Sequence, residues 1–149
     1  MKPVVLNEAE IERLRKRFAG KPGTSEYDGD GGKRFFHKAL FNSVLVFECE
    51  FGLIRVTDYV PSQKVRIHGL FDSKQVFREI GQLKALGNYL FDRLHIQWIE
   101  ALVPVDKRAL QRLLKRVGFQ EKGALRKDFY DGKMYTEGVL YWLTRRDLL

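Results

Sequence analysis

Residues 65–119, VRIHGLFDSKQVFREIGQLKALGNYLFDRLHIQWIEALVPVDKRALQRLLKRVGF, decide the fold of this chain. Alternating apolar residues predict a strand over 64–71, and apolar residues at three- and four-residue steps predict a long helix over about 74–94. A second strand over 96–103 and a second helix over 106–117 follow. A strand, a crossover helix and a strand form a right-handed unit with two parallel strands. We therefore expect a cleft for an anionic ligand where the carboxyl ends of these strands face a helix N-terminus.

The flanking segments predict further strands and helices. Asn7 and Glu10 form a capping-box pattern at the start of a helix over about 8–19, after a short strand over 4–6. Residues 20–33 predict a loop, and residues 34–41 predict a short amphipathic helix of the kind that covers a substrate cleft. Runs at 43–50 and 53–60 lead into the strand over 64–71 as an antiparallel meander, and 124–130 with 136–144 predict a closing hairpin. Gly81 and Gly87 in the long helix predict close packing against the sheet.

Length and hydropathy indicate one domain over residues 1–149. The chain is 44% hydrophobic, which is enough to fill a single core. No apolar run approaches the roughly 20 residues that a membrane span needs, and the first residues turn polar too early for a signal peptide. We therefore expect no membrane partner and a cytoplasmic protein.

Charge and cysteine usage restrict the choice of partners. The net charge of +8 is compatible with a nucleic acid, with a phosphorylated cofactor such as coenzyme A, or simply with good solubility. Cys49 is a lone cysteine without the spacing of a metal site. Asp28 and Asp30 begin a calcium-loop pattern, but the glycine and the bidentate glutamate that this loop requires are absent. We therefore expect no bound metal.

Three segments resemble the GNAT superfamily of N-acyltransferases. Residues 108–126, RALQRLLKRVGFQEKGALR, and 130–148, YDGKMYTEGVLYWLTRRDL, are similar to the family's helix ending in Gly-Phe, its acidic-Gly strand and its closing hairpin. Residues 89–104, YLFDRLHIQWIEALVP, resemble the family's central helix and fifth strand. The resemblance implies an α/β (α+β) fold with a mixed, mostly antiparallel sheet of six to seven strands, about four helices, and splayed strands four and five. It implies transfer of an acetyl group from acetyl-CoA to an amine that the sequence does not identify, on a small molecule or on a protein.

The resemblance also implies where acetyl-CoA binds. In this family it enters between strands four and five, and an Arg/Gln-x-x-Gly-x-Gly/Ala loop binds its pyrophosphate through backbone N–H groups. Counting back from Gly118-Phe119 puts the basic position at Lys74 or Gln75, without the glycines, whereas a shift to Arg78-x-x-Gly81 restores one glycine and shortens the helix. Lys107 stands at the family's asparagine position, where it can meet a phosphate or simply face solvent. The predicted cofactor-binding residues are Leu70, Phe71, Lys74, Gln75, Arg78, Ile80, Gly81 and Lys107.

Two residues are candidates for the proton acceptor. Direct transfer to an amine needs a base, a donor that polarises the thioester carbonyl, and proximity. His68 is the first candidate because an imidazole titrates near pH 6.5, although a structural role on a half-buried sheet face is the more frequent reason for such a histidine. Glu100 on the next strand is the second, and the backbone N–H near Leu70 or Phe71 is the expected carbonyl donor. Leu114 stands where the family often has a tyrosine acid. Tyr130, Tyr135 and Tyr141 in the hairpin are available as acids, although a hairpin tyrosine is more often a core or surface residue.

Three functions remain open at this point. The first is an N-acetyltransferase with a divergent phosphate loop. The second is an inactive GNAT-fold binding or structural protein, because a strand ending in His-x-Leu-Phe is similar to a branch often carried by bacteriophages and prophages. That alternative implies phage structural proteins or a second copy of the chain as partners, in the host cytoplasm or the virion. The third is nucleic-acid binding by the basic face of the helix over 106–117, which the absence of interleaved exposed aromatic residues disfavours.

Overall fold

The computed structural model of the chain describes residues 1–18, 43–71, 73–130 and 135–148, without the side chains of 124–130 and 135–136. The predicted loop over 20–33, the predicted helix over 34–41 and the tip of the hairpin lie outside the described residues. The elements in chain order are β1 (Lys2–Pro3), α1 (Glu8–Phe18), β2 (Leu45–Cys49), β3 (Gly52–Val60), β4 (Lys64–Phe71), the 3-10 helix η2 (Lys74–Arg78), α2 (Ile80–Leu94), β5 (Trp98–Pro104), α3 (Arg108–Val117), β6 (Gln120–Tyr130), β7 (Tyr135–Thr144) and the 3-10 helix η3 (Arg145–Leu148).

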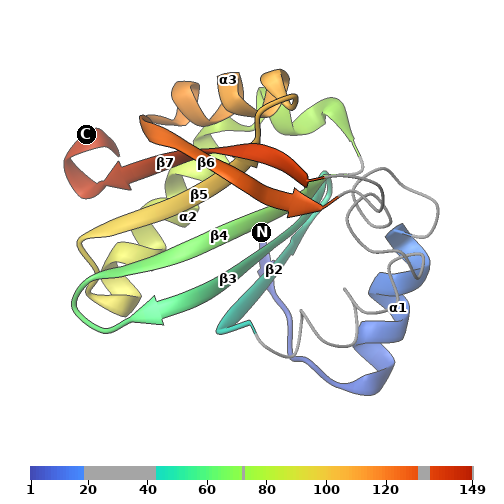
Figure 1. Ribbon diagram of the computed structural model, residues 1–149. Coiled ribbons are helices and arrows are strands. Elements are labelled where there is room, and N and C mark those ends of the chain that lie inside the picture. The colour runs from blue at the N-terminus through green and yellow to red at the C-terminus, as the bar shows by residue number, and fades with distance from the viewer. Residues whose placement is uncertain (19–42, 72, 131–134, 149) are drawn as a thin grey trace.

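The strands of the described part form one seven-stranded sheet in the order β1-β2-β3-β4-β5-β7-β6 (Figure 1). β4 and β5 are parallel, and each of the other neighbouring pairs is antiparallel. The helix α2 connects the parallel pair, as the periodicity predicted. The expected mixed, mostly antiparallel sheet is therefore confirmed.

The two faces of the sheet are covered differently. α2 and α3 pack on one face, where they enclose the larger apolar core with inward residues such as Val65, Ile99 and Tyr141. α1 packs on the other face, and its apolar stripe of Ile11, Leu14 and Phe18 covers the β2–β3–β4 end of the sheet. Figure 1 shows α1 and α3 far apart, on opposite sides of the strands. None of the helices described combines the length and apolar character needed to cross a bilayer.

The first turns of the predicted long helix were wrong. Residues 74–78 form the separate 3-10 helix η2, and Glu79 interrupts the backbone with φ −106° and ψ 38° before α2 begins at Ile80. The break has a local cause, because the Ser73 side chain accepts the Gln75 N–H at 3.1 Å and caps η2. The predicted strand over 4–6 was also wrong, since the first strand pairs through Lys2–Pro3.

Asn7 caps α1 as predicted, but Glu10 does not complete a capping box. The Asn7 Oδ1 accepts the Glu10 N–H at 2.9 Å, whereas the Glu10 carboxylate pairs with Arg13. Arg13 and Arg17 reach across to Glu48 on β2, at 2.7 and 2.9 Å. The basic side of α1 therefore forms ion pairs that link the helix to β2 of the sheet.

The two glycines of α2 differ in how closely they pack against neighbouring residues. A Cβ on Gly87 would lie 3.0 Å from a methyl group of Leu148, so close packing explains this glycine. A Cβ on Gly81 would meet nothing within 4 Å, so close packing does not explain the second one.

Candidate functional site

The parallel strands β4 and β5 pair over only part of their length. Pairing runs from Lys64 opposite Trp98 to Ile67 opposite Ala101. Beyond that point residues 68–71 remain paired with β3, and residues 102–104 remain paired with β7. The two halves of the sheet therefore diverge at the carboxyl ends of both strands, which is the predicted splay.

His68 and Glu100 lie on the same face of the sheet at the closed end of this opening. Arg66 is opposite Glu100 in the register, and His68 follows Arg66 by two residues, so the three side chains share a face. This face is the one opposite α2 and α3. The structure thus brings the two predicted proton acceptors to neighbouring strands.

His68 is held neutral by its surroundings. Burial lowers its pKa to about 3, and the positive charges of Arg55 and Arg66 act in the same direction. Its Nε2 lies 2.9 Å from the Thr57 Oγ1, whose single hydrogen is donated to Asp58 Oδ2 at 3.0 Å. The Thr57 oxygen must therefore accept from the Nε2–H, which leaves Nδ1 as the unprotonated nitrogen.

A pKa near 3 makes His68 a weak base. The surroundings suit His68 to orient a substrate through a hydrogen bond rather than to take its proton.

Glu100 is a buried carboxylate with cationic neighbours. Its exposed fraction is 7%, and its Oε2 lies 3.1 Å from the Lys64 Nζ and 3.6 Å from the Arg66 Nη2. Both cations approach the same oxygen. Glu100 thereby places an acceptor-only group in a fixed position beside the opening, where it can accept a hydrogen bond from an amine.

The predicted residues at the end of β4 face opposite sides of the sheet. Leu70 is buried against α1, whereas Phe71 packs on the side of α2. The Phe71 ring folds back along the strand, since a Cβ on Gly69 would lie only 2.5 Å from its Cζ. On the helix side, the ring therefore covers the strand that borders the opening.

The start of α2 has backbone donors that its N-cap side chain does not bind. Its N-cap residue Glu79 makes no side-chain cap hydrogen bond to the helix, so the first-turn amides of Ile80, Gly81 and Gln82 have no side-chain cap. Arg78 is exposed immediately before the helix, and the space beside Gly81 is open. The observed helix start thus agrees with the shifted register Arg78-x-x-Gly81.

The remaining predicted cofactor residues lie on neighbouring elements. Lys74 and Gln75 are exposed on η2, one turn before Arg78, and the Gln75 N–H is already bonded to Ser73. Lys107 is the half-buried N-cap residue of α3, after the carboxyl end of β5. Because β4 and β5 are parallel, both helix starts lie at the open end of the strand pair.

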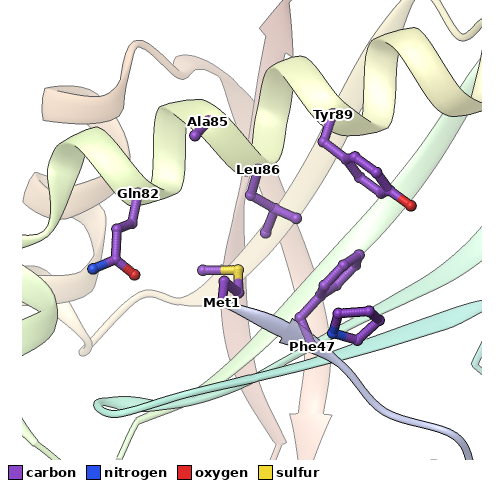
Figure 2. Close-up of a pocket in the computed structure, with 7 residues that line it drawn as sticks. Met1, Phe47, Gln82, Ala85, Leu86 and Tyr89 are labelled. Carbon is purple, nitrogen blue, oxygen red and sulfur yellow. The ribbon is translucent and has the colours of Figure 1, made fainter.

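A cavity of about 400 Å³ lies apart from these residues. It is lined by Met1, Pro3, Phe47, Gln82, Ala85, Leu86 and Tyr89, between α2 and the β1–β2 edge (Figure 2). The Phe47 and Tyr89 rings meet edge to face, with centroids 5.8 Å apart. The lining residues described include no carboxylate, imidazole or basic side chain, so the cavity offers apolar contact rather than acid–base chemistry.

The sequence interpretation missed several side chains around the opening. Gln111 donates to the Val105 carbonyl at 2.9 Å and accepts from the Tyr141 hydroxyl at 3.2 Å. Its two hydrogen bonds therefore connect the β5–α3 turn with β7. Tyr141 is fully buried, and burial raises the pKa of its hydroxyl. Arg66, Trp98 and Trp142 were also missed, although their alternation in phase with Glu100 was a usable signal.

Solved structures with the same fold include GNAT acetyltransferases. A GNAT-family acetyltransferase from Bacillus anthracis superposes with a TM-score of 0.70 at 15% identity, over 97% of this chain and 94% of that one. Spermidine N-acetyltransferase from Vibrio cholerae, in complex with CoA and spermine, gives 0.72 at 14% identity over 99% and 96%. Ribosomal-protein-S5-alanine acetyltransferase from Vibrio fischeri gives 0.71 at 11% identity over 99% and 94%.

No family model matches the chain, and no curated protein matches its sequence. The structural likeness covers nearly the whole of each chain, and it establishes that the described residues adopt the GNAT fold.

Proposed function

We propose that this protein is an N-acetyltransferase that moves an acetyl group from acetyl-CoA to an amine. The observation that carries the proposal is the opening between β4 and β5, which has two acid–base side chains on one face and two helix N-termini at its open end. This arrangement brings an anionic cofactor and an amine to the same gap from different elements.

The residues at the start of α2 fit a pyrophosphate in part. The first-turn amides without a side-chain cap and the Arg78 guanidinium supply donors, and the absence of a side chain at Gly81 lets a phosphate approach the backbone. Glu79 opposes this fit through its negative charge, although its carboxylate is held by the Gln75 and Gln82 amides at 3.3 and 2.9 Å. The family's second small position falls at Leu83.

We assign the proton-transfer and orienting roles to Glu100 and His68, on the sheet face opposite α2 and α3. When bound, acetyl-CoA supplies the thioester whose carbonyl carbon is attacked. Glu100, the carboxylate fixed beside the opening, takes the proton that the amine loses as the C–N bond forms, directly or through one water. The same proton then passes to the thiol sulfur that is released as the C–S bond breaks. His68 orients the amine through its unprotonated Nδ1. The backbone N–H groups near Leu70 and Phe71 polarise the thioester carbonyl.

The test is calorimetric titration with acetyl-CoA and with the unreactive desulfo-CoA. We expect micromolar binding, about −8 kcal/mol, and at least tenfold weaker binding by Arg78→Ala. Gly81→Ala is the sharper variant. It should raise the free energy of unfolding by up to about 1 kcal/mol, because alanine favours a helix, and yet weaken binding tenfold or more. Asn88→Ala, at an exposed position further along α2, is the matched control and should bind like wild type.

A second candidate function has its own support. The Phe71 ring over Gly69 and the Glu79 carboxylate at the start of α2 are both unfavourable to a cofactor. They favour a protein that keeps the GNAT fold for binding without acyl transfer. Absence of heat and of thermal stabilisation at millimolar acetyl-CoA would leave this candidate in place of the first.

A further inference from the structure

Two tryptophans stack on the sheet face that carries Glu100. The Trp98 and Trp142 rings have centroids 4.7 Å apart and planes inclined by 22°. Trp142 is opposite Glu100 in the register, and Glu100 is opposite Arg66, so these side chains form a row across three strands. Trp98 and Trp142 are the two tryptophans of the whole chain. We call the surface made by Lys64, Arg66, Trp98, Glu100 and Trp142 the basic face.

The basic face contains buried donors that nothing in the described residues satisfies. The Nε of Arg66 and the Nε1 atoms of Trp98 and Trp142 are shielded from solvent, and no acceptor among those residues binds them. A buried polar group without a partner costs about 1–3 kcal/mol, and native proteins leave few of them. All three groups are N–H donors, so whatever satisfies them must bring acceptor oxygens.

The charges on this face also favour a ligand with acceptor oxygens. Lys64 and Arg66 share the single carboxylate of Glu100, at 3.1 and 3.6 Å. A further cation, Lys122, holds its Nζ 5.5 Å from the centre of the Trp142 ring. Positive side chains therefore outnumber the carboxylate in the immediate surroundings of the tryptophan pair. Such a surface attracts an anion and repels a second cation.

A ligand would approach the face at Arg66 and Lys64. These two side chains are 26% and 21% exposed, although the Arg66 Nε is shielded. An anion would first pair with these two partly exposed cations. The indoles must then tilt for their N–H groups to reach its oxygens, which makes the tryptophans reporters of binding.

We infer that the basic face binds the oxyanion, a phosphate or a carboxylate, of an amine substrate. This inference rests on the proposed acetyltransferase function and names the class of its acceptor as an amine that carries an anionic group. Arg66 and the two indole N–H groups hold the oxyanion, while Glu100, in the same row, faces the amine. A polyamine, with positive charges only, fits this surface poorly.

The experiment follows the two indole N–H resonances of the ¹⁵N-labelled protein by NMR at constant ionic strength in a phosphate-free buffer. The probes are O-phosphoethanolamine, β-alanine, ethanolamine and spermidine. We expect saturable shifts of both resonances with the phosphate or the carboxylate probe, and the stronger of the two identifies the oxyanion. Ethanolamine, which lacks an anionic group, and spermidine should leave both resonances in place.

Three variants connect the shifts to named side chains. Arg66→Gln should weaken binding of the anionic probe at least tenfold, because a charge-assisted hydrogen bond is lost. Trp142→Phe keeps an aromatic ring, removes one N–H, and should weaken binding severalfold while the remaining indole resonance still shifts. Arg112→Gln removes the same charge as Arg66→Gln from an exposed position on α3 and should bind like wild type.

Three results would overturn the inference. These are stronger indole shifts with spermidine than with either anionic probe, indole resonances that none of the probes moves at millimolar concentration, and equal weakening by Arg66→Gln and Arg112→Gln. The titrations are run with and without desulfo-CoA. Failure of desulfo-CoA to bind counts against the acetyltransferase proposal. The probe titrations run without desulfo-CoA test anion binding by the basic face independently of that proposal.

Discussion

Acidification should destabilise the fold through His68. The folded state keeps this imidazole neutral, with its pKa lowered to about 3 by burial and by Arg55 and Arg66, whereas an unfolded histidine titrates near pH 6.5. The unfolded state therefore binds an extra proton between these two values. The stabilisation from neutral His68 is complete above pH 6.5 and is lost progressively as the pH falls toward 3.

The magnitude follows from the two pKa values. Between pH 7 and pH 5 the folded His68 remains unprotonated, while protonation lowers the free energy of the unfolded state by about 2 kcal/mol. His68→Gln removes the titrating group and keeps an amide that can donate to Thr57. The variant should therefore lose about 2 kcal/mol less stability than wild type between these two pH values.

The assay is urea unfolding followed by circular dichroism, at pH 7 and pH 5, for wild type and variant. The difference between the two pH-dependent losses cancels the carboxylates that both proteins share. His95→Asn is the control, because His95 is exposed and asparagine tolerates its left-handed backbone at φ 53°. Equal losses in wild type and His68→Gln would refute the reasoning, as would an NMR titration of folded His68 with a midpoint near pH 6.5.

Three further predictions concern β2 and the first residue of β3. Glu48→Gln should lower the free energy of unfolding at pH 7 by about 1 kcal/mol in urea unfolding, because the two arginines of α1 that hold the pKa of Glu48 low lose their carboxylate partner. The difference between variant and wild type should vanish in acid, where the wild-type carboxyl is protonated. Gly52→Ala should cost about 2 kcal/mol or more in urea unfolding, since its φ is 154° and its Cβ would lie 2.3 Å from a carbonyl oxygen of β4. Cys49 should react with a thiol reagent at pH 8 far more slowly in the folded than in the unfolded protein, because burial raises the pKa of its thiol, and equal rates would contradict this.

The sequence predicted those elements that local patterns determine. Strand β4 was predicted with its observed limits because its alternation is uninterrupted and a Pro-Ser turn precedes it. The splay of β4 and β5 could be expected from the family resemblance, although no local pattern in either strand marks the residue at which pairing stops. The cap of α1 followed directly from Asn7.

The break before α2 also depends on a contact between distant residues, in addition to the local Ser73 cap. Val76 and Phe77 continue the apolar stripe of the helix, so periodicity alone merges η2 with α2. The structure fixes the break partly through Arg116 on α3, which donates to the Phe77 carbonyl at 3.0 Å from 39 residues away. No pattern within the segment encodes that hydrogen bond.

The electrostatics of the candidate site depend on register. Arg55 becomes a neighbour of His68 only because β3 and β4 pair in one particular alignment. The same holds for Arg66 and Glu100 across β4 and β5. A candidate base could therefore be selected from its residue type, but its weakness as a base could not be foreseen.

The strand order has a consequence for how the chain folds. β6 is synthesised before β7, yet among the described strands its one partner is β7, which lies between β6 and β5. During synthesis the outer edge of β5 and both edges of β6 must stay unpaired until β7 has emerged from the ribosome. Unpaired edges promote association between chains, and pairings between distant segments form slowly. We expect a nascent chain that stops before β7 to be prone to aggregation, and the joining of β7 to β5 to complete folding.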